Sequence, residues 1–272
     1  MRLAISNIAW TPAEDDAVGE AMRREGAAAV EIAPTLYWPD PLAASAAEVD
    51  ACREAWARRG FPVAALQSLL FGQPHLQLFG DTSDEMARRL EGMAGLAARL
   101  GAPVMVFGSP KNRLRGSLSP AQALERAVPF FRRLGEAAAR RGVALCLEPN
   151  PPQYGCDFVT TAAEGRELVE RVGSPGFGLH LDLAGMRLAG EDGPAELGRS
   201  LPWLRHVHFS APGLGQVLPG AADYRAAAEA LSAGGYQGFV SVEMRAEGDA
   251  AARVARVAET LRFVHALAGD GA

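Results

Sequence analysis

The amino-acid sequence predicts an α/β protein that forms a single (β/α)8 TIM barrel, and three observations lead to this prediction. Short apolar runs alternate with Ala-, Arg- and Glu-rich stretches, and eight such units fit along the 272 residues. The apolar runs are nearly continuous, as parallel strands covered on both faces require. Barrels of this class commonly hold about 250 residues in one domain. We therefore expect one domain over residues 1–272, with its active site at the C-terminal face of the strands.

The eight apolar runs are the expected strands. They lie at Leu3–Ser6, Ala28–Ile32, Pro62–Leu66, Pro103–Phe107, Val143–Leu147, Phe177–Leu181, Leu204–His208 and Phe239–Val242. The repeat takes roughly thirty to forty residues, which is the length of a strand with its crossover helix.

The starts and ends of the expected helices carry regular signals. Five segments have the capping-box form, in which a hydroxyl and a carboxyl or amide group satisfy free backbone N–H groups: Thr11–Glu14, Ser45–Glu48, Thr82–Glu85, Ser119–Gln122 and Thr161–Glu164. A glycine that can adopt positive φ closes five helices, at Gly26, Gly60, Gly101, Gly142 and Gly173. The order along the chain is thus strand, loop, helix, glycine, strand.

The unusual residues are concentrated in the strand-to-helix loops. These loops are expected at residues 7–11, 34–41, 67–81, 108–116 and 148–160, whereas the helix-to-strand loops are short and plain. In a closed barrel all strand-to-helix loops lie at one end, so the chemistry is expected there.

Composition and charge exclude several classes of protein. The net charge of −5 comes from 27 basic and 32 acidic residues without long like-charge runs, which argues against nucleic-acid and anionic-membrane partners. The three cysteines show no Cys-x-x-Cys spacing, so reduced thiols are the simplest interpretation. No signal segment and no apolar stretch of ~20 residues is visible. We expect a cytoplasmic enzyme of small molecules; whether copies associate into a homo-oligomer stays open.

Four of the expected strands end on, or just before, a residue that can bind a hard metal ion. These residues are Glu148, Asp182, His208 and Glu243, separated by 34, 26 and 35 residues. Three carboxylates and one imidazole suit Mn²⁺, Mg²⁺ or Co²⁺ with open positions better than a closed structural Zn²⁺ site, although Zn²⁺ is kept as an alternative. Converging carboxylates repel one another unless a cation holds them.

Each residue of this set also has an ordinary interpretation. Glu148 or Glu243 alone could cap a helix or face solvent, and Asp182 alone could begin a turn. For the whole set, the alternative is that the predicted strands are shifted by a residue or two, so that some of the side chains point outward.

With these residues in place, the chain resembles the xylose-isomerase-like barrel superfamily of sugar isomerases and epimerases. The segments that carry the resemblance are Leu147-Glu148-Pro149, His180-Leu181-Asp182, His206-Val207-His208 and Val242-Glu243. The resemblance implies that Glu148, Asp182, His208 and Glu243 bind one divalent ion, with Mn²⁺ as our choice, and that Glu148 and Glu243 also transfer the proton. A cation beside the carbonyl would stabilise the enediolate that proton removal creates.

The chain departs from the ketose 3-epimerase pattern at three places. Gly185 stands where such epimerases carry a histidine, Leu214 where they carry an arginine, and Gly155 and Cys156 where an acidic residue follows the tyrosine. The metal set is intact, but the substrate contacts are expected to differ.

Candidate substrate contacts fall into two groups. Lys111 and Arg113, in a loop of small residues, could cradle a phosphate or carboxylate or could be a solvated basic loop. Arg245 could reach an anion at the barrel mouth or pair with Glu247. The polar group comprises Gln67, Glu31, Asn150 and Tyr154, which could bind hydroxyls or only pack the loops, and His180, which could orient a ligand or contact substrate. His206 is interpreted as a core histidine.

The sequence thus predicts a divalent-metal-dependent isomerase or epimerase of a sugar, sugar phosphate or keto-polyol. A dehydratase of the inosose or dehydroshikimate type would use the same proton abstraction, and a non-catalytic sugar-binding barrel would keep the metal for structure. A DNA endonuclease of the superfamily is set aside, because its three-metal site needs more than the five histidines present and the net charge is unfavourable.

Overall fold

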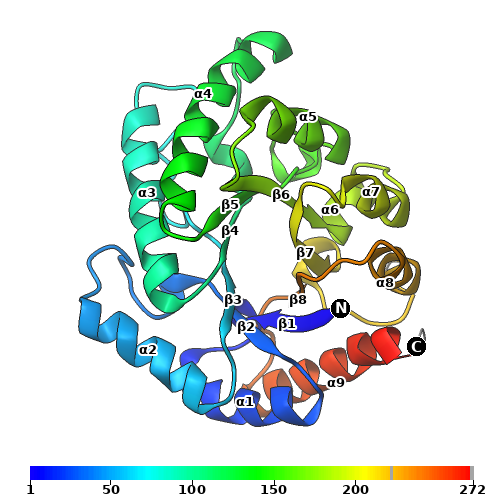
Figure 1. Ribbon diagram of the computed structural model, residues 1–272. Coiled ribbons are helices and arrows are strands. Elements are labelled where there is room, and N and C mark those ends of the chain that lie inside the picture. The colour runs from blue at the N-terminus through cyan, green and yellow to red at the C-terminus, as the bar shows by residue number, and fades with distance from the viewer. Residues whose placement is uncertain (221–222, 270–272) are drawn as a thin grey trace.

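The structure is a computed structural model that describes residues 1–220 and 223–269, and within them eight parallel strands close into a barrel in chain order (Figure 1). The strands are β1 (Arg2–Ser6), β2 (Ala29–Ile32), β3 (Val63–Leu66), β4 (Val104–Phe107), β5 (Ala144–Leu147), β6 (Phe177–Asp182), β7 (Leu204–Ser210) and β8 (Phe239–Glu243). Each begins and ends within two residues of its predicted bounds. The predicted fold class is confirmed.

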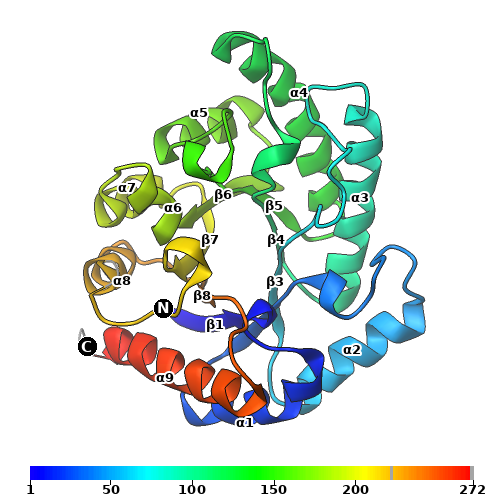
Figure 2. The same ribbon diagram turned by 180° about the vertical axis from the view of Figure 1, so that it is seen from behind.

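Helices surround the barrel as an outer ring, which Figures 1 and 2 show from its two ends. They are α1 (Asp15–Arg24), α2 (Ala46–Arg58), α3 (Ser83–Leu100), α4 (Pro120–Ala139), α5 (Ala162–Val172), α6 (Leu183–Leu188), α7 (Gly193–Ser200), α8 (Tyr224–Ala233) and α9 (Ala250–Gly269). The connection from β6 to β7 holds two short helices, α6 and α7. In the described part of the chain, no helix is both long and apolar enough to cross a membrane.

The helix-end signals are mostly confirmed. Complete capping boxes form at Ser45 and Ser119, and at Thr11 before a short 3-10 turn. The box predicted at Thr82 is wrong, because the Thr82 hydroxyl donates to the carbonyl oxygen of His75 at 2.9 Å and so secures the preceding loop. Thr161 caps the Glu164 N–H at 3.3 Å, but the Glu164 carboxylate accepts from Thr160 instead. The five predicted closing glycines all have positive φ.

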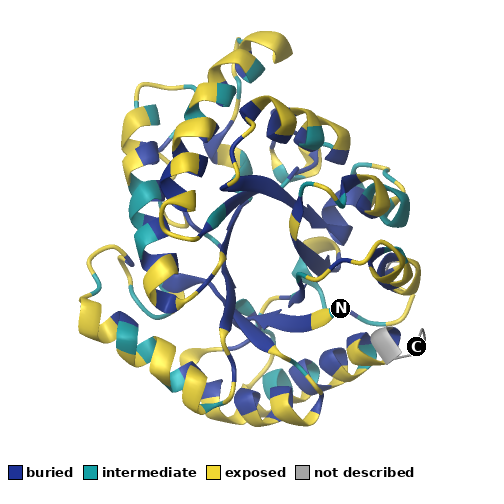
Figure 3. Cartoon of the chain, in the orientation of Figure 1, coloured by how far each residue is buried: buried dark blue, intermediate teal, exposed yellow. Residues whose placement is uncertain are grey.

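The core has an outer and an inner part. Large apolar side chains pack between strands and helices, and Figure 3 shows the helices buried on one side only. Inside the barrel lie two small apolar clusters: one comprises Ala4, Ala29, Ala64 and Phe239, the other Ala65, Val104, Val106 and Cys146, of which Val106 reaches the barrel mouth. The interior also holds polar side chains, with Glu31, His180, His206 and His208 at most 1% exposed. A polar layer beneath the barrel mouth therefore supports the site.

Candidate metal centre

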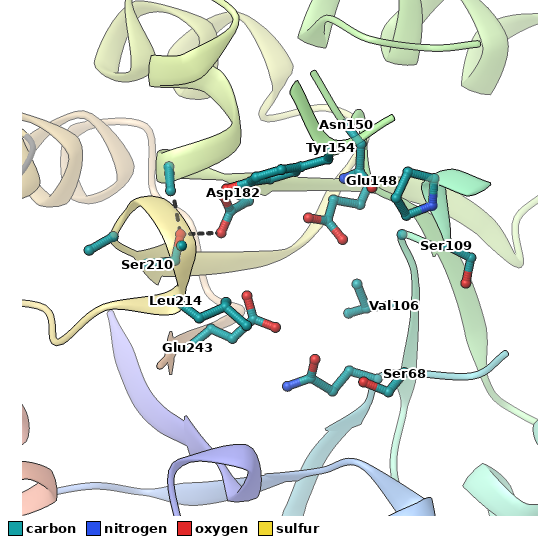
Figure 4. A pocket seen from close by; sticks show the side chains of 16 residues that line it. Ser68, Val106, Ser109, Glu148, Asn150, Tyr154, Asp182, Ser210, Leu214 and Glu243 are labelled. Atoms are coloured by element: carbon teal, nitrogen blue, oxygen red, sulfur yellow. Dashed lines mark hydrogen bonds between the residues drawn. The ribbon is translucent and has the colours of Figure 1, made fainter. Parts of the chain in front are cut away.

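The C-terminal ends of β5 to β8 bring the four predicted ligands together: Glu148, Asp182 and Glu243 line one pocket, and His208 lies buried beside it. Asp182 and Glu243 end β6 and β8, His208 lies in β7, and Glu148 directly follows β5. One ligand atom each of Asp182, His208 and Glu243 lies within 4.8 Å of the others, which is close enough for one ion. Glu148 lies outside that group of three but lines the same pocket, and Figure 4 shows its carboxylate pointing toward the space between Asp182 and Glu243.

The carboxylate of Asp182 is held by its surroundings. Its Oδ1 accepts the Gly185 N–H at 2.5 Å, which caps helix α6, and its Oδ2 accepts the Ser210 hydroxyl (Figure 4). Sequence analysis missed Ser210, although it lies two residues beyond His208 on the same strand and so points the same way.

The His208 imidazole lies between two carboxylates. Its Nδ1 is 3.4 Å from Oε2 of Glu243, and its Nε2 is 3.0 Å from both carboxylate oxygens of Glu31. Burial alone would disfavour the charged imidazole, but the charges of Glu31 and Glu243 raise the pKa of His208 well above its usual value. The ring is therefore held at Nε2 by Glu31, while Nδ1 lies beside Glu243 without a hydrogen bond.

Crowding of the acidic side chains is visible in their proton affinities. Burial removes water from the Glu148 carboxylate and, together with the charges of Asp182 and Glu243, raises its pKa to about 8. Burial of the Asp182 carboxylate away from water and the charge of Glu243 raise the pKa of Asp182 to about 6. Repulsion between the carboxylates contributes to both shifts, and a divalent cation among them would relieve it. The donor set of carboxylate oxygens and one imidazole nitrogen therefore fits a divalent cation.

The pocket has a volume of about 410 Å³, and its described lining contains no cationic residue. Its described lining is Gln67, Ser68, Val106, Gly108, Ser109, Pro110, Glu148, Asn150, Tyr154, Asp182, Ala184, Ser210, Ala211, Gly213, Leu214 and Glu243. Three of these residues are acidic, and none is lysine, arginine or histidine. Gly108 makes room for the acid, because a Cβ there would lie 2.5 Å from Oε2 of Glu148.

Comparison with known proteins decides the family. Residues 20–267 match the family model described as the xylose isomerase-like TIM barrel. The chain belongs to this family. By sequence, no curated protein matches it at a significant level.

Solved structures resemble this xylose isomerase-like barrel along its whole length. D-psicose 3-epimerase from Clostridium cellulolyticum H10, solved with D-tagatose, has a TM-score of 0.82 at 17% identity, covering 98% of this chain and 99% of its own. An L-ribulose 3-epimerase has a TM-score of 0.81 at 20% identity, covering 99% and 95%. The IolI protein with a bound zinc atom has a TM-score of 0.72 at 20% identity, covering 99% and 96%. At these identities the likeness shows the fold.

The predicted contacts other than the three cations lie at two depths of this barrel. Gln67, Asn150 and Tyr154 line the pocket, and the Gln67 amide donates to the Ser6 hydroxyl below it. Glu31 and His180 lie outside the pocket lining, in the polar layer beneath it. His206 lies in the same layer, where its Nε2 is 3.3 Å from Oε2 of Glu31.

The three predicted cations do not line the pocket. Arg113 is 0% exposed, and its guanidinium donates to the backbone carbonyls of Gly108, Glu148, Phe158 and Val159 at 2.5 to 3.1 Å. Arg113 therefore fits neither interpretation of its loop: it holds the loops after β4 and β5 together. Lys111 is exposed. Arg245 pairs with Glu247 at 2.7 Å, which was the second of its two alternatives.

Three residues at the pocket have unusual backbone conformations. Ser68, Ser109 and Leu214 have φ of 56°, 41° and 56°, in the left-handed region that disfavours side chains. Serine and leucine give no sequence signal for this conformation, so the prediction missed all three. Strained backbone of this kind is concentrated at functional sites, where surrounding structure holds it in place.

Proposed function

We propose that this protein is a divalent-metal-dependent epimerase or isomerase of an uncharged sugar or keto-polyol. The observation that carries the proposal is the placement of Glu148 and Glu243, which face one pocket from different strands beside Asp182 and His208 (Figure 4). The fold it shares with two sugar 3-epimerases supports the same reaction class.

Glu148, Asp182, His208 and Glu243 would hold the ion, for which we favour Mn²⁺ because oxygen-rich donor sets suit hard ions. The chemistry that such a cation supplies when bound is stabilisation of negative charge on substrate oxygens. The chain's own residues do the rest. Asp182 is fixed by Ser210 and the Gly185 N–H, and His208 by Glu31, so both keep their places as the substrate enters.

The two glutamates are suited to move a proton. One carboxylate takes a proton from the carbon beside the carbonyl, and the other delivers a proton to the carbon's opposite face or to its neighbour. The first outcome is epimerisation and the second is isomerisation.

The lining favours a substrate without a charged group. Glu148, Asp182 and Glu243 make the pocket negative, and no described lining residue offsets them. A phosphate would enter this field without an arginine or lysine to bind it, whereas neutral hydroxyls can bond to Gln67 and Asn150.

The experiment is proton exchange with solvent. The Mn²⁺-loaded protein is incubated in D₂O with a panel of neutral ketoses and keto-polyols, and deuterium beside the carbonyl is followed by NMR. We expect exchange with at least one substrate, and about 10²- to 10⁴-fold slower exchange for Glu148→Gln and for Glu243→Gln. Lys111→Ala is the control and should leave the rate unchanged.

Other outcomes would contradict the proposal. Loss of water from the substrate, seen as a new ultraviolet absorbance, would indicate a dehydratase. Tight sugar binding without any exchange would indicate a binding protein.

A further inference from the structure

Glu31 is the most enclosed acidic group of the chain's polar layer and takes no part in the proton transfer proposed above. It is 0% exposed, and it does not line the pocket. Its carboxylate oxygens both lie 3.0 Å from Nε2 of His208, and one lies 3.3 Å from Nε2 of His206. These partners lie 177 and 175 residues away in the sequence, across the barrel. A carboxylate buried at this depth needs such partners, because burying it alone is costly.

The contact with Glu31 decides which nitrogen of His208 is free. A carboxylate accepts a hydrogen bond, so the Nε2 that faces Glu31 carries the hydrogen. Binding an ion requires the neutral ring, whose lone pair is then on Nδ1, the atom that faces Glu243 at 3.4 Å. Carboxylate partners of this kind commonly fix the tautomer and orientation of a metal-binding histidine.

Two irregularities in the strands lie beside this cluster. Between β2 and β3 the pairing shifts from Val30 with Val63 to Glu31 with Ala65, which leaves one extra residue on β3. Between β6 and β7 it shifts at His180 and His206, which leaves one extra residue on β7. Bulges of this kind re-aim side chains and are common beside active sites. Here they lie next to the side chains that meet inside the barrel.

We propose that Glu31 is a positioning residue that holds His208 through Nε2, so that Nδ1 faces the ion position beside Asp182 and Glu243. The inference rests on the proposed metal site and adds a residue that sets how tightly that site binds. Glu31 does not touch substrate, so its effect passes through the affinity and geometry of the ion.

A second buried ion is the competing interpretation. The ligand atoms of Glu31, His206 and His208 lie within 4.8 Å of one another, and neither ring nitrogen of His180 has a partner in the described structure. The cluster lies outside the pocket, however, and Glu31 already bonds to both histidines at hydrogen-bond distance. We therefore assign these contacts to orientation, and the experiment counts ions to decide.

The test measures metal binding directly. Dissociation constants for Mn²⁺ and Zn²⁺ are obtained by competition with a chromophoric chelator for the wild type, Glu31→Gln and the control His206→Asn, which keeps the bond from Glu31 to His208. We expect one ion per chain in all three and about 10- to 100-fold weaker binding for Glu31→Gln. The dissociation constant of His206→Asn should stay within about threefold of the wild-type value, because His206 is not a ligand of the proposed ion.

Two results would overturn the inference. One is an unchanged dissociation constant for Glu31→Gln. The other is a second ion in the wild type that this variant loses, which would make Glu31 a ligand itself.

A metal-free measurement keeps the inference separate from the proposed function. Long-range ¹H–¹⁵N spectra of the wild type without metal report which His208 nitrogen carries hydrogen, and we expect Nε2 to be protonated. An unprotonated Nε2 would refute the role of Glu31 even if Glu31→Gln does not fold. A protonated Nε2 in a protein that binds no metal would refute the proposed function and leave the contact from Glu31 to His208 in place.

Discussion

The two walls of the barrel mouth face the same pocket with opposite chemistry. The acidic wall, formed by Glu148, Asp182 and Glu243 at the ends of β5, β6 and β8 with His208 buried behind them, carries the charged residues of the described pocket lining. The neutral wall, formed by Gln67, Ser68, Val106 and Ser109 on and after β3 and β4, carries none. Under the proposed function, the acidic wall would perform the reaction and the neutral wall would contact the rest of the substrate.

The walls also differ in how their side chains are aimed. Asp182 and Glu243 end regular strands, so strand geometry directs them into the barrel mouth. Ser68 and Ser109 instead reach the pocket from loops with positive φ. A strained loop holds its side chain only while its neighbours hold the loop. The neutral wall should therefore tolerate changes that the acidic wall does not.

The largest effect is expected from breaking the acidic wall. Asp182→Asn removes one charge from the ion site while keeping the side-chain shape, and we expect metal affinity to fall about 100- to 1,000-fold, because an amide is a weaker ligand than a carboxylate. Isothermal titration with Mn²⁺ measures this, with Ser68→Ala on the neutral wall as the matched control. Equal affinities for Asp182→Asn and the wild type would remove Asp182 from the ligand set.

The next effect concerns the residue that joins the walls. Arg113→Met should lower the free energy of unfolding by about 3 kcal/mol, because backbone carbonyls in the loops after β4 and β5 lose a charged donor and stay buried. Denaturant unfolding measures the loss, and exposed Lys111→Ala serves as the control. A loss below about 0.5 kcal/mol, the usual range for surface changes, would show that the carbonyls find other donors.

A third experiment tests whether the pocket as a whole discriminates against a charged substrate. A neutral ketose that the enzyme turns over should have a kcat/KM about 100-fold higher than its terminal phosphate, since an unpaired buried charge costs a few kcal/mol. Leu214→Arg, which places a cation in the pocket lining, should narrow that ratio. Comparable rates for both substrates with the wild type would contradict an uncharged substrate.

Glu14 lies outside both walls, and its contact with Arg253 is expected to stabilise the protein in a pH-dependent way. Glu14 accepts hydrogen bonds from Arg253 at 2.8 and 2.5 Å, and this contact, with the Thr11 N–H, lowers the Glu14 pKa to about 2. A lowered acid pKa stabilises the fold above the unfolded value of about 4.3, and this stability is lost as pH falls toward 2. Glu14→Gln should therefore cost about 1 to 2 kcal/mol at pH 7 and little at pH 2.

Denaturant unfolding of Glu14→Gln at several pH values checks this sign. A cost that stays constant from pH 7 to pH 2 would show that the contact with Arg253 does not depend on the charge of Glu14.

The smallest effect is expected on the neutral wall. Ser68→Gly should stabilise the protein by about 0.5 kcal/mol. Glycine adopts positive φ without the steric cost that serine pays, and this gain slightly exceeds the extra conformational entropy that glycine loses on folding. Ser68→Ala keeps the strain and removes the hydroxyl, so it should not share this gain. Thermal unfolding of both variants separates strain from hydrogen bonding. Equal free energies of unfolding for Ser68→Gly and Ser68→Ala would show that positive φ at this position does not limit stability.

The sequence by itself determined the strand positions, the order of the barrel and the four residues at the strand ends. Apolar periodicity and the glycines that follow the helices are local signals, and Asp182 and Glu243 follow from where a strand ends. Local signals failed where a side chain had two possible hydrogen-bond partners. The Thr82 hydroxyl donates to the His75 carbonyl oxygen in the preceding loop and does not form the predicted capping box.

Only the tertiary structure decided the partners of Glu31, the burial of Arg113 and the absence of a cation from the described pocket lining. Glu31 meets His208 across 177 residues, and no pattern in β2 shows which side chain lies opposite it. Arg113 and Lys111 look alike in sequence, yet one is enclosed by carbonyls and the other is exposed. Contacts between distant segments depend on how the whole barrel closes. The spacing of two residues in the sequence does not reveal how far apart they lie in the closed barrel.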